Sequence, residues 1–132
     1  MFDFQDKVVV VTGGARGIGR CICERFSASG AKVCVIDLLD NDYFVGDLAD
    51  KTVLEQFAAK VIADYGRVDV LVNNAAPKMC GIGNGSYEDF EYALRVGVTA
   101  PFYLSKLFAP YFAQGASIVN ISSSRDRMSQ KE

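Results

Sequence analysis

Short runs of apolar residues alternate along this chain with longer stretches in which apolar residues recur every three or four positions. The short runs predict strands buried on both faces, and the longer stretches predict the helices that cover them. The predicted strands are Lys7–Thr12, Lys32–Asp37, Tyr43–Gly46, Val68–Val72 and Ala116–Ile121. The predicted helices are Arg16–Ser29, Asp50–Tyr65 and Ser86–Phe112.

This order of elements predicts a doubly wound α/β fold, a Rossmann-like parallel sheet with helices on both faces. The helices after the first, third and fourth strands should cross over in the right-handed sense, which gives the strand order 3-2-1-4-5. Ligands bind such sheets at the carboxyl ends of the strands, beside the point where the strand order reverses. The unusual short motifs of this chain follow strand ends, which favours a ligand site at that edge.

The third predicted helix, Ser86–Phe112, is apolar on two opposite sides. One side carries Leu94, Val98, Phe108 and Phe112, and the other carries Tyr92, Val96, Tyr103 and Leu107. A helix that is apolar all round is buried all round, so the second side needs a further helix or another chain. We therefore expect self-association through this helix. Pro101 and Pro110 predict a kink or a break within it.

Composition narrows the classes of protein that remain. The 132 residues, half of them hydrophobic, predict one domain over residues 1–132 with a sizeable core. The net charge of −2 without a basic cluster argues against nucleic acid, and no apolar run is long enough for a membrane span. There is no histidine and no C-x-x-C pair among Cys21, Cys23, Cys34 and Cys80, so we expect reduced core thiols and no metal site. The N-terminus lacks a signal-peptide pattern, and together these features predict a cytoplasmic protein.

The segment from Val8 to Gly19, VVVVTGGARGIG, carries the strongest functional signal. A strand of four valines turns through Thr12 and Gly13 and enters a helix near Gly17. Glycines let the backbone approach phosphate groups, and the N–H groups at a helix start face negative charge. The arrangement predicts a site for the pyrophosphate of a dinucleotide.

Asp37 ends the second predicted strand, eighteen residues after Gly19. A carboxylate at this position accepts hydrogen bonds from the adenosine ribose hydroxyls and repels a 2′-phosphate. Leu38 follows, so no basic side chain stands there to hold that phosphate, although Arg16 in the loop is an alternative holder. The pattern favours NAD over NADP as the cofactor. Without the glycine loop, Asp37 would be interpreted as an ordinary strand-end turn residue.

The loop spacing T-G-x-x-x-G-x-G resembles the cofactor loop of the short-chain dehydrogenase/reductase family. The sequence NNAA at 73–76 is similar to the N-N-A-G signature of that family, with Ala76 where glycine is usual. The cofactor-binding residues that the resemblance and the loop chemistry imply are Thr12, Gly13, Arg16, Gly17, Ile18, Gly19, Asp37, Asp47, Leu48, Asn74, Ala75 and Ala76.

Two further positions take a role from the resemblance. Asp47, after the third predicted strand, matches an aspartate that contacts the adenine amino group; the alternative is that Asp47 or Asp50 caps the next helix. Ser123, after the fifth predicted strand, matches the catalytic serine that hydrogen-bonds the substrate carbonyl or hydroxyl, with Ser122 as second choice. A polar turn is the alternative for both serines.

The resemblance implies reversible hydride transfer between a nicotinamide dinucleotide and a small alcohol or carbonyl substrate. The acid/base of the family is a tyrosine in a Tyr-x-x-x-Lys motif, whose lysine lowers the tyrosine pKa. The 132 residues contain no such motif, and Gly97 stands where the family usually has an asparagine that supports proton transfer. We therefore expect this chain alone, an incomplete domain relative to the family, to bind the cofactor without turnover.

Two other classes of protein fit parts of the pattern. A small module that binds NAD, or that docks on a partner through its long helix, needs no acid/base residues. A flavin or response-regulator module shares the doubly wound fold. Response regulators, however, need acidic residues at strand ends, and the first strand here ends in Thr12 and Gly13.

Overall fold

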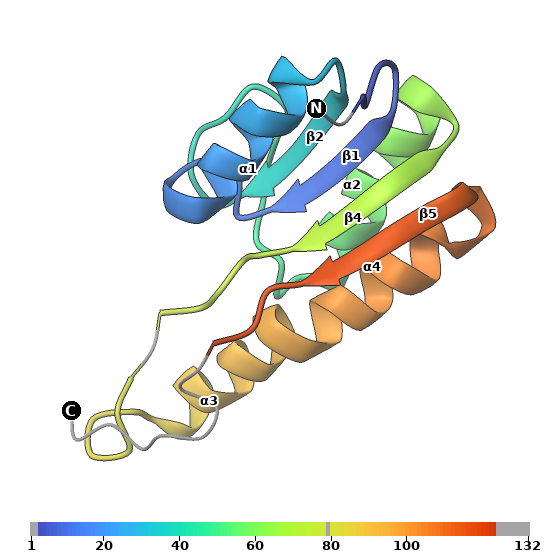
Figure 1. Cartoon of the computed structure of the whole chain (residues 1–132). Helices are drawn as coiled ribbons and strands as arrows, with labels where there is room; N and C mark the ends of the chain where they lie inside the picture. The colour runs from blue at the N-terminus through green and yellow to red at the C-terminus, as the bar shows by residue number, and fades with distance from the viewer. Residues whose placement is uncertain (1–2, 79, 124–132) are drawn as a thin grey trace.

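The computed structural model describes residues 3–78 and 80–123 (Figure 1). The strands are β1 (Val8–Thr12), β2 (Lys32–Asp37), β3 (Phe44–Val45), β4 (Val68–Asn73) and β5 (Phe112–Asn120). The helices are α1 (Gly17–Ala28), α2 (Lys51–Tyr65), α3 (Tyr87–Leu94) and α4 (Ala100–Phe108), with a π-helical turn η1 (Arg95–Thr99) and a 3-10 turn η2 (Ala109–Tyr111). The strands form one parallel sheet in the order β3-β2-β1-β4-β5, which confirms the predicted doubly wound fold.

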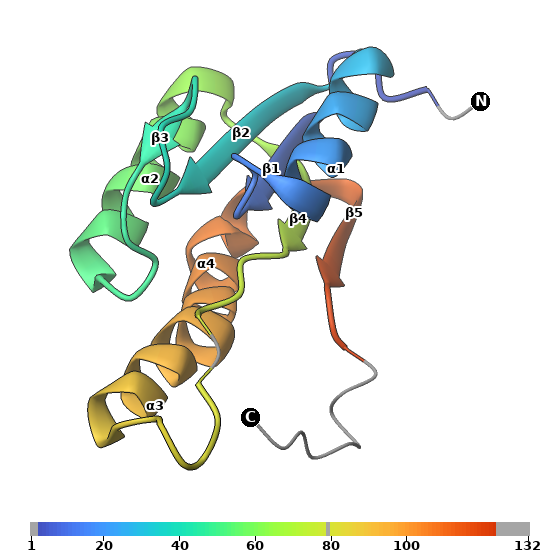
Figure 2. The same cartoon turned by 90° about the vertical axis from the view of Figure 1, so that its left-hand side faces the viewer.

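Helices cover both faces of the sheet, with α1 on one face and α2 and α4 on the other (Figure 2). The four valines of β1 explain this arrangement, because successive side chains of a strand point to opposite faces. Val8 and Val10 lie in the large core cluster that includes residues of α2 and α4. Val9 and Val11 lie in a smaller cluster against Ile22 of α1. The prediction of a strand buried on both faces is therefore confirmed for β1.

The stretch predicted as one long helix, Ser86–Phe112, is helical as far as Tyr111 but is interrupted by the π-helical turn η1. In this turn the amide of Ala100 donates to the carbonyl of Arg95, five residues back. Pro101 follows at once, has no N–H for the carbonyl four residues earlier, and would crowd that carbonyl with its ring. The predicted kink is thus a widened turn before Pro101, and α3 extends past the carboxyl edge of the sheet (Figure 1).

The π-helical turn changes which residues share a side of the long helix. One extra residue in a turn rotates the positions after it by about 100°. The buried side consists of Val96, Ala100, Leu104 and Phe108, and the exposed apolar side consists of Phe90, Leu94, Val98 and Phe102. Two apolar sides are therefore confirmed, but the prediction that Phe108 shares a side with Leu94 and Val98 is wrong.

The last strand, β5, begins at Phe112, four residues before the strand predicted over Ala116–Ile121. Gly115, with a φ of 79°, lies where the register of β5 against β4 shifts. Because β5 forms an edge of the sheet, Ile118 and Val119 remain 46% and 42% exposed. The prediction that this strand is buried on both faces is therefore wrong.

Candidate functional site

The glycine loop between β1 and α1 lies at the carboxyl edge of the sheet. Gly13 and Gly17 have φ values of 69° and 57°, in the left-handed region that favours glycine. A Cβ on Gly19 would lie 2.0 Å from the carbonyl oxygen of Gly13, so only glycine lets the helix pass this close to the loop. The first turn of α1 has no side-chain cap and no acidic residue. Such a backbone cradle fits the pyrophosphate of a dinucleotide.

Thr12 and Asn74 fasten the glycine loop to the end of β4. The Thr12 hydroxyl accepts hydrogen bonds from the amides of Asn74 and Ala75, at 3.1 and 3.0 Å. The side-chain amide of Asn74 donates to the carbonyls of Thr12 and Gly13, both at 3.1 Å. These predicted cofactor residues therefore hold the two motifs together at one edge of the sheet.

The Asp37 carboxylate lies between the end of β2 and the glycine loop. Its Oδ2 accepts from the amide of Ala15 at 2.9 Å, and its Oδ1 accepts from the amide of Leu39 at 3.0 Å. Each carboxylate oxygen keeps a second lone pair, so ribose hydroxyls still have acceptors there. An anion placed at the same point meets a negative charge and finds the amide of Ala15 already engaged.

The structure distinguishes the roles of Asp47 and Asp50. Asp50 is the N-cap of α2, and its carboxylate accepts from the amide of Thr52 at 2.8 Å. Asp47 Oδ1 accepts from the amide of Ala49 at 2.8 Å and from the hydroxyl of Tyr92 at 3.0 Å. Asp47 therefore does not cap the helix. Its second oxygen, Oδ2, has no hydrogen-bond donor within the described part of the chain.

The other predicted cofactor residues differ in their exposure. Leu48 is buried in the core, and Ala75 is half-buried against the same core. Arg16, Ile18 and Ala76 are exposed, Ile18 to 68%. The exposed positions are open to a ligand, whereas only a small part of Leu48 is accessible.

The two serines of the predicted substrate position, Ser122 and Ser123, follow β5 and are exposed. The strand end before them is joined to β4. The Asn73 side-chain amide donates to Asn120 Oδ1 at 2.8 Å, and the amide of Ile121 donates to the Asn73 carbonyl at 3.0 Å. The buried Oδ1 of Asn73 has no partner among the residues that the structure describes. The catalytic role of Ser123 stays a prediction.

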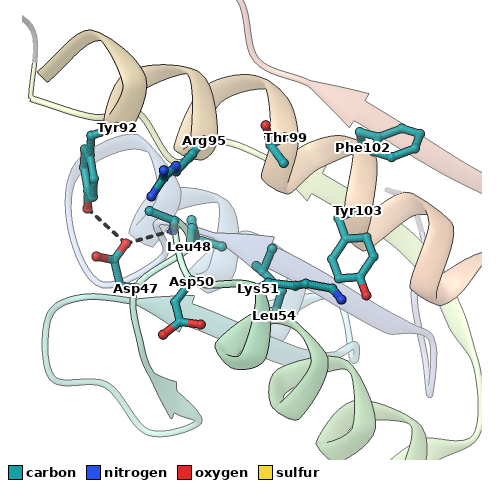
Figure 3. Close-up of a pocket in the computed structure, with 11 residues that line it drawn as sticks. Asp47, Leu48, Asp50, Lys51, Leu54, Tyr92, Arg95, Thr99, Phe102 and Tyr103 are labelled. Carbon is teal, nitrogen blue, oxygen red and sulfur yellow. Dashed lines mark hydrogen bonds between the residues drawn. The ribbon is translucent and has the colours of Figure 1, made fainter. Parts of the chain in front are cut away.

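A cavity that the sequence did not predict lies between α2 and the long helix, with a volume of about 680 Å3 (Figure 3). It shares Asp47 and Leu48 with the predicted cofactor residues, and Tyr92 and Arg95 reach it from the long helix. Tyr92 and Asp47 are 45 positions apart in the sequence. Helical periodicity assigns Tyr92 only to an apolar side, so no sequence signal pairs it with Asp47.

The structure also describes the surroundings of the cysteines and the acidic side chains. Among residues 3–78 and 80–123 no group of three or more cysteine or acidic side chains is placed to hold a metal ion, and no helix is long and apolar enough to cross a bilayer. Cys21 and Cys80 are exposed, so the prediction of four core thiols is wrong for these two. Burial raises the pKa of the Cys23 and Cys34 thiols to about 11, which keeps both protonated.

Comparisons with known proteins identify the family to which this site belongs. The sequence pattern of the short chain dehydrogenase family matches residues 7–132. An uncharacterized oxidoreductase from Thermotoga maritima is 33% identical over 97% of this chain and 57% of its own length. The chain therefore belongs to the short-chain dehydrogenase/reductase family, and it spans about half the length of the curated relatives it matches.

Solved structures support the same assignment. The ligand-free aldohexose dehydrogenase from Thermoplasma acidophilum has a TM-score of 0.86 and 34% identity, over 97% of this chain and 53% of that one. A blue fluorescent protein from a metagenomic library, in complex with NADPH, has a TM-score of 0.88 and 28% identity, over 98% of this chain and 61% of that one. The fold is therefore that of an oxidoreductase family that binds a nicotinamide cofactor.

Proposed function

We propose that these residues form the cofactor-binding part of an NAD-dependent oxidoreductase that acts on an alcohol or carbonyl substrate. The observation that carries the proposal is the Asp37 carboxylate, hydrogen-bonded to the glycine loop beside the start of α1. The cradle of Gly13 and Gly19 would hold the pyrophosphate, and Asp37 and Asp47 would accept hydrogen bonds from the adenosine. The bound dinucleotide supplies the hydride acceptor, and this chain's residues bind and orient it.

The preference for NAD rests on charge. The Asp37 carboxylate repels a 2′-phosphate, and its bond to the amide of Ala15 removes a donor that such a phosphate would use. Leu38, the next residue, is 59% exposed and carries no charge. Arg16 in the glycine loop is the basic side chain that would bind the 2′-phosphate if the chain preferred NADP. Two structural neighbours hold NADPH or NADP, so the choice has to be measured on this chain.

On the substrate side, we assign to Ser123 the hydrogen bond to the substrate oxygen. The 132 residues contain no Tyr-x-x-x-Lys motif, so they lack the acid/base pair that moves the proton in the family reaction. The proposal is therefore that this chain by itself binds the dinucleotide and does not turn over an alcohol.

A fluorescence titration with NADH and with NADPH tests the proposal. We expect saturable binding that is at least about tenfold tighter for NADH, since about 1.4 kcal/mol of repulsion at the 2′-phosphate gives that factor. Asp37→Ala should weaken NADH binding by about tenfold, because the ribose loses an ionised acceptor and the loop loses its contact with β2. The preference for NADH over NADPH should shrink in the same variant.

Asp42→Ala is the matched control, since it removes an exposed carboxylate that lies between β2 and β3 and has no hydrogen bond or ion pair in the described part of the chain. It should leave both affinities unchanged. Tighter binding of NADPH than of NADH would overturn the assignment of NAD. No binding of either dinucleotide would overturn the cofactor site, and alcohol-dependent reduction of NAD by this chain would contradict the expected lack of turnover.

A further inference from the structure

Tyr92 reaches from α3 to the segment that follows β3 and contacts Asp47 there (Figure 3). Its hydroxyl donates to Asp47 Oδ1 at 3.0 Å. The amide of Ala49 donates to the same oxygen at 2.8 Å. Two donors, one from the adjoining segment and one from a distant helix, therefore hold one oxygen of this carboxylate.

The other oxygen of Asp47 is left for a ligand. No described residue donates to Oδ2, and neither Lys51 nor Arg95, which also line the cavity, forms an ion pair with Asp47. The backbone at Asp47 is held as well, because its carbonyl accepts from the amide of Asp50 at 3.1 Å. A partial rotation of the carboxylate away from this orientation would lengthen the bonds from the Tyr92 hydroxyl and the Ala49 amide. The tyrosine hydroxyl therefore restricts the direction in which Oδ2 points.

Tyr92 is itself held firmly. Its ring packs partly buried against the core, and α3 begins with a reciprocal capping box between Ser86 and Asp89. Burial, and next the hydrogen bond to Asp47, raise the pKa of Tyr92, so the hydroxyl remains a donor throughout the neutral range. A protonated donor on a packed ring is suited to orient a carboxylate.

We propose that Tyr92 is a positioning residue for base recognition, which orients Asp47 so that Oδ2 accepts a hydrogen bond from the amino group of the adenine ring. The inference rests on the proposed function, since it needs a dinucleotide whose base lies against Asp47. The contact between Tyr92 of the long helix and Asp47 after β3 would then make the site select a purine that carries an amino group, such as adenine. A tyrosine with a purely structural role would stabilise the fold without changing the choice of base.

The test compares NADH with reduced nicotinamide hypoxanthine dinucleotide, in which an oxygen replaces the adenine amino group. NADH should bind the native chain about tenfold more tightly, the effect of one hydrogen bond to a carboxylate. Tyr92→Phe keeps the packed ring and removes only the hydroxyl. We expect its ratio of affinities to fall to about threefold or less, as the carboxylate loses one of its two donors. Both dinucleotides are titrated on the same variant, so a general loss of stability does not change the ratio.

Tyr103→Phe is the matched control, because Tyr103 also donates its hydroxyl from the long helix, to Glu55 of α2. It should keep the native ratio, and Asp47→Ala should abolish the preference for adenine. If Tyr92→Phe keeps the native preference for NADH over the hypoxanthine dinucleotide while Asp47→Ala loses it, the role of Tyr92 is overturned and the proposed function stays intact. NADH binding by the native chain without a base preference would overturn the inference alone. No NADH binding would overturn the proposed function and the inference with it.

Discussion

At the scale of single residues, the absence of a side chain at Gly19 allows the start of α1 to pack closely against the glycine loop. A Cβ there would lie 2.0 Å from the Gly13 carbonyl oxygen and 2.5 Å from the Asn74 side-chain nitrogen. Gly19→Ala therefore has to move the start of α1 away from the glycine loop and from Asn74. We expect a free energy of unfolding lower by about 1–3 kcal/mol, as for other overpacked sites. NADH binding should weaken by at least about tenfold, and urea denaturation and the NADH titration measure the two effects.

Gly97→Ala provides the comparison for that variant. A Cβ on Gly97 meets no atom within 4 Å, and the residue lies in the π-helical turn of the long helix. Because alanine favours helix over glycine, the variant should be as stable as the native chain or up to about 1 kcal/mol more stable. Its affinity for NADH should not change. Equal behaviour of the two alanine variants would contradict the tight approach at Gly19.

The residues of the site differ in how far the sequence could predict them. The glycine spacing marks Gly13 and Gly19 because a close backbone approach is a local requirement that the residue type itself reveals. Thr12 and Asn74 are placed by the same motifs. The contact between Tyr92 and Asp47 joins distant segments, and it depends on the angle at which the long helix meets the sheet. No local pattern encodes that angle, so this part of the site came only from the structure.

At the scale of elements, Asp69 in β4 connects that strand to the start of β1. Its side chain is 8% exposed, pairs with Arg67 at 2.6 Å and accepts from the amide of Val8 at 2.9 Å. Burial by itself would raise the pKa of Asp69, but the hydrogen bonds from Arg67 and from the Val8 amide outweigh it and lower the pKa. The unfolded state therefore binds more protons than the folded state in acid. The stability that Asp69 contributes is complete near neutral pH and is lost as the pH falls.

Asp69→Asn tests this connection. At pH 7 we expect a free energy of unfolding lower by about 1–3 kcal/mol, because asparagine keeps an acceptor for the Val8 amide but loses the ionic contact with Arg67. As the pH falls below about 5, the native chain should lose more stability than the variant, and urea denaturation at several pH values measures both slopes. Glu24→Gln, which breaks an exposed pair with Arg20, should change stability by less than about 0.5 kcal/mol. Equal pH slopes for the native chain and Asp69→Asn would contradict the argument.

The sequence predicted best the strands that are buried between the helical layers. Short apolar runs predict β1, β2 and β4 within one residue of their observed ends, because strands that lie between two helical layers are largely apolar. The π-helical turn was not predictable from the sequence. Pro101 indicates an irregularity in the helix, but it does not determine whether the helix kinks, breaks or widens into a π-helical turn. The early start of β5 was missed because Gln114 and Gly115 interrupt the apolar pattern between Phe112 and Ile118, where the register of the strand shifts.

At the scale of the whole molecule, one side of the long helix is apolar and exposed to solvent. Phe90, Leu94, Val98 and Phe102 are 66%, 45%, 63% and 66% exposed. They lie one helical turn apart along the side opposite the buried residues, so they form one continuous strip. At about 25 cal/mol per Å2, burial of four such side chains contributes several kcal/mol. An apolar strip of this kind is typical of an interface.

We propose that two copies of this chain associate through that strip, and the double substitution Leu94→Glu with Val98→Glu tests it. Opposed carboxylates in a symmetric contact repel and lose their hydration, so the association constant should fall by at least about a hundredfold. Sedimentation velocity over a range of concentrations measures this change. Ile82→Glu, which adds the same charge at a fully exposed loop residue, should leave association unchanged. A native chain that stays monomeric at every concentration would contradict the proposal, because nothing else in the described residues covers this side of the helix.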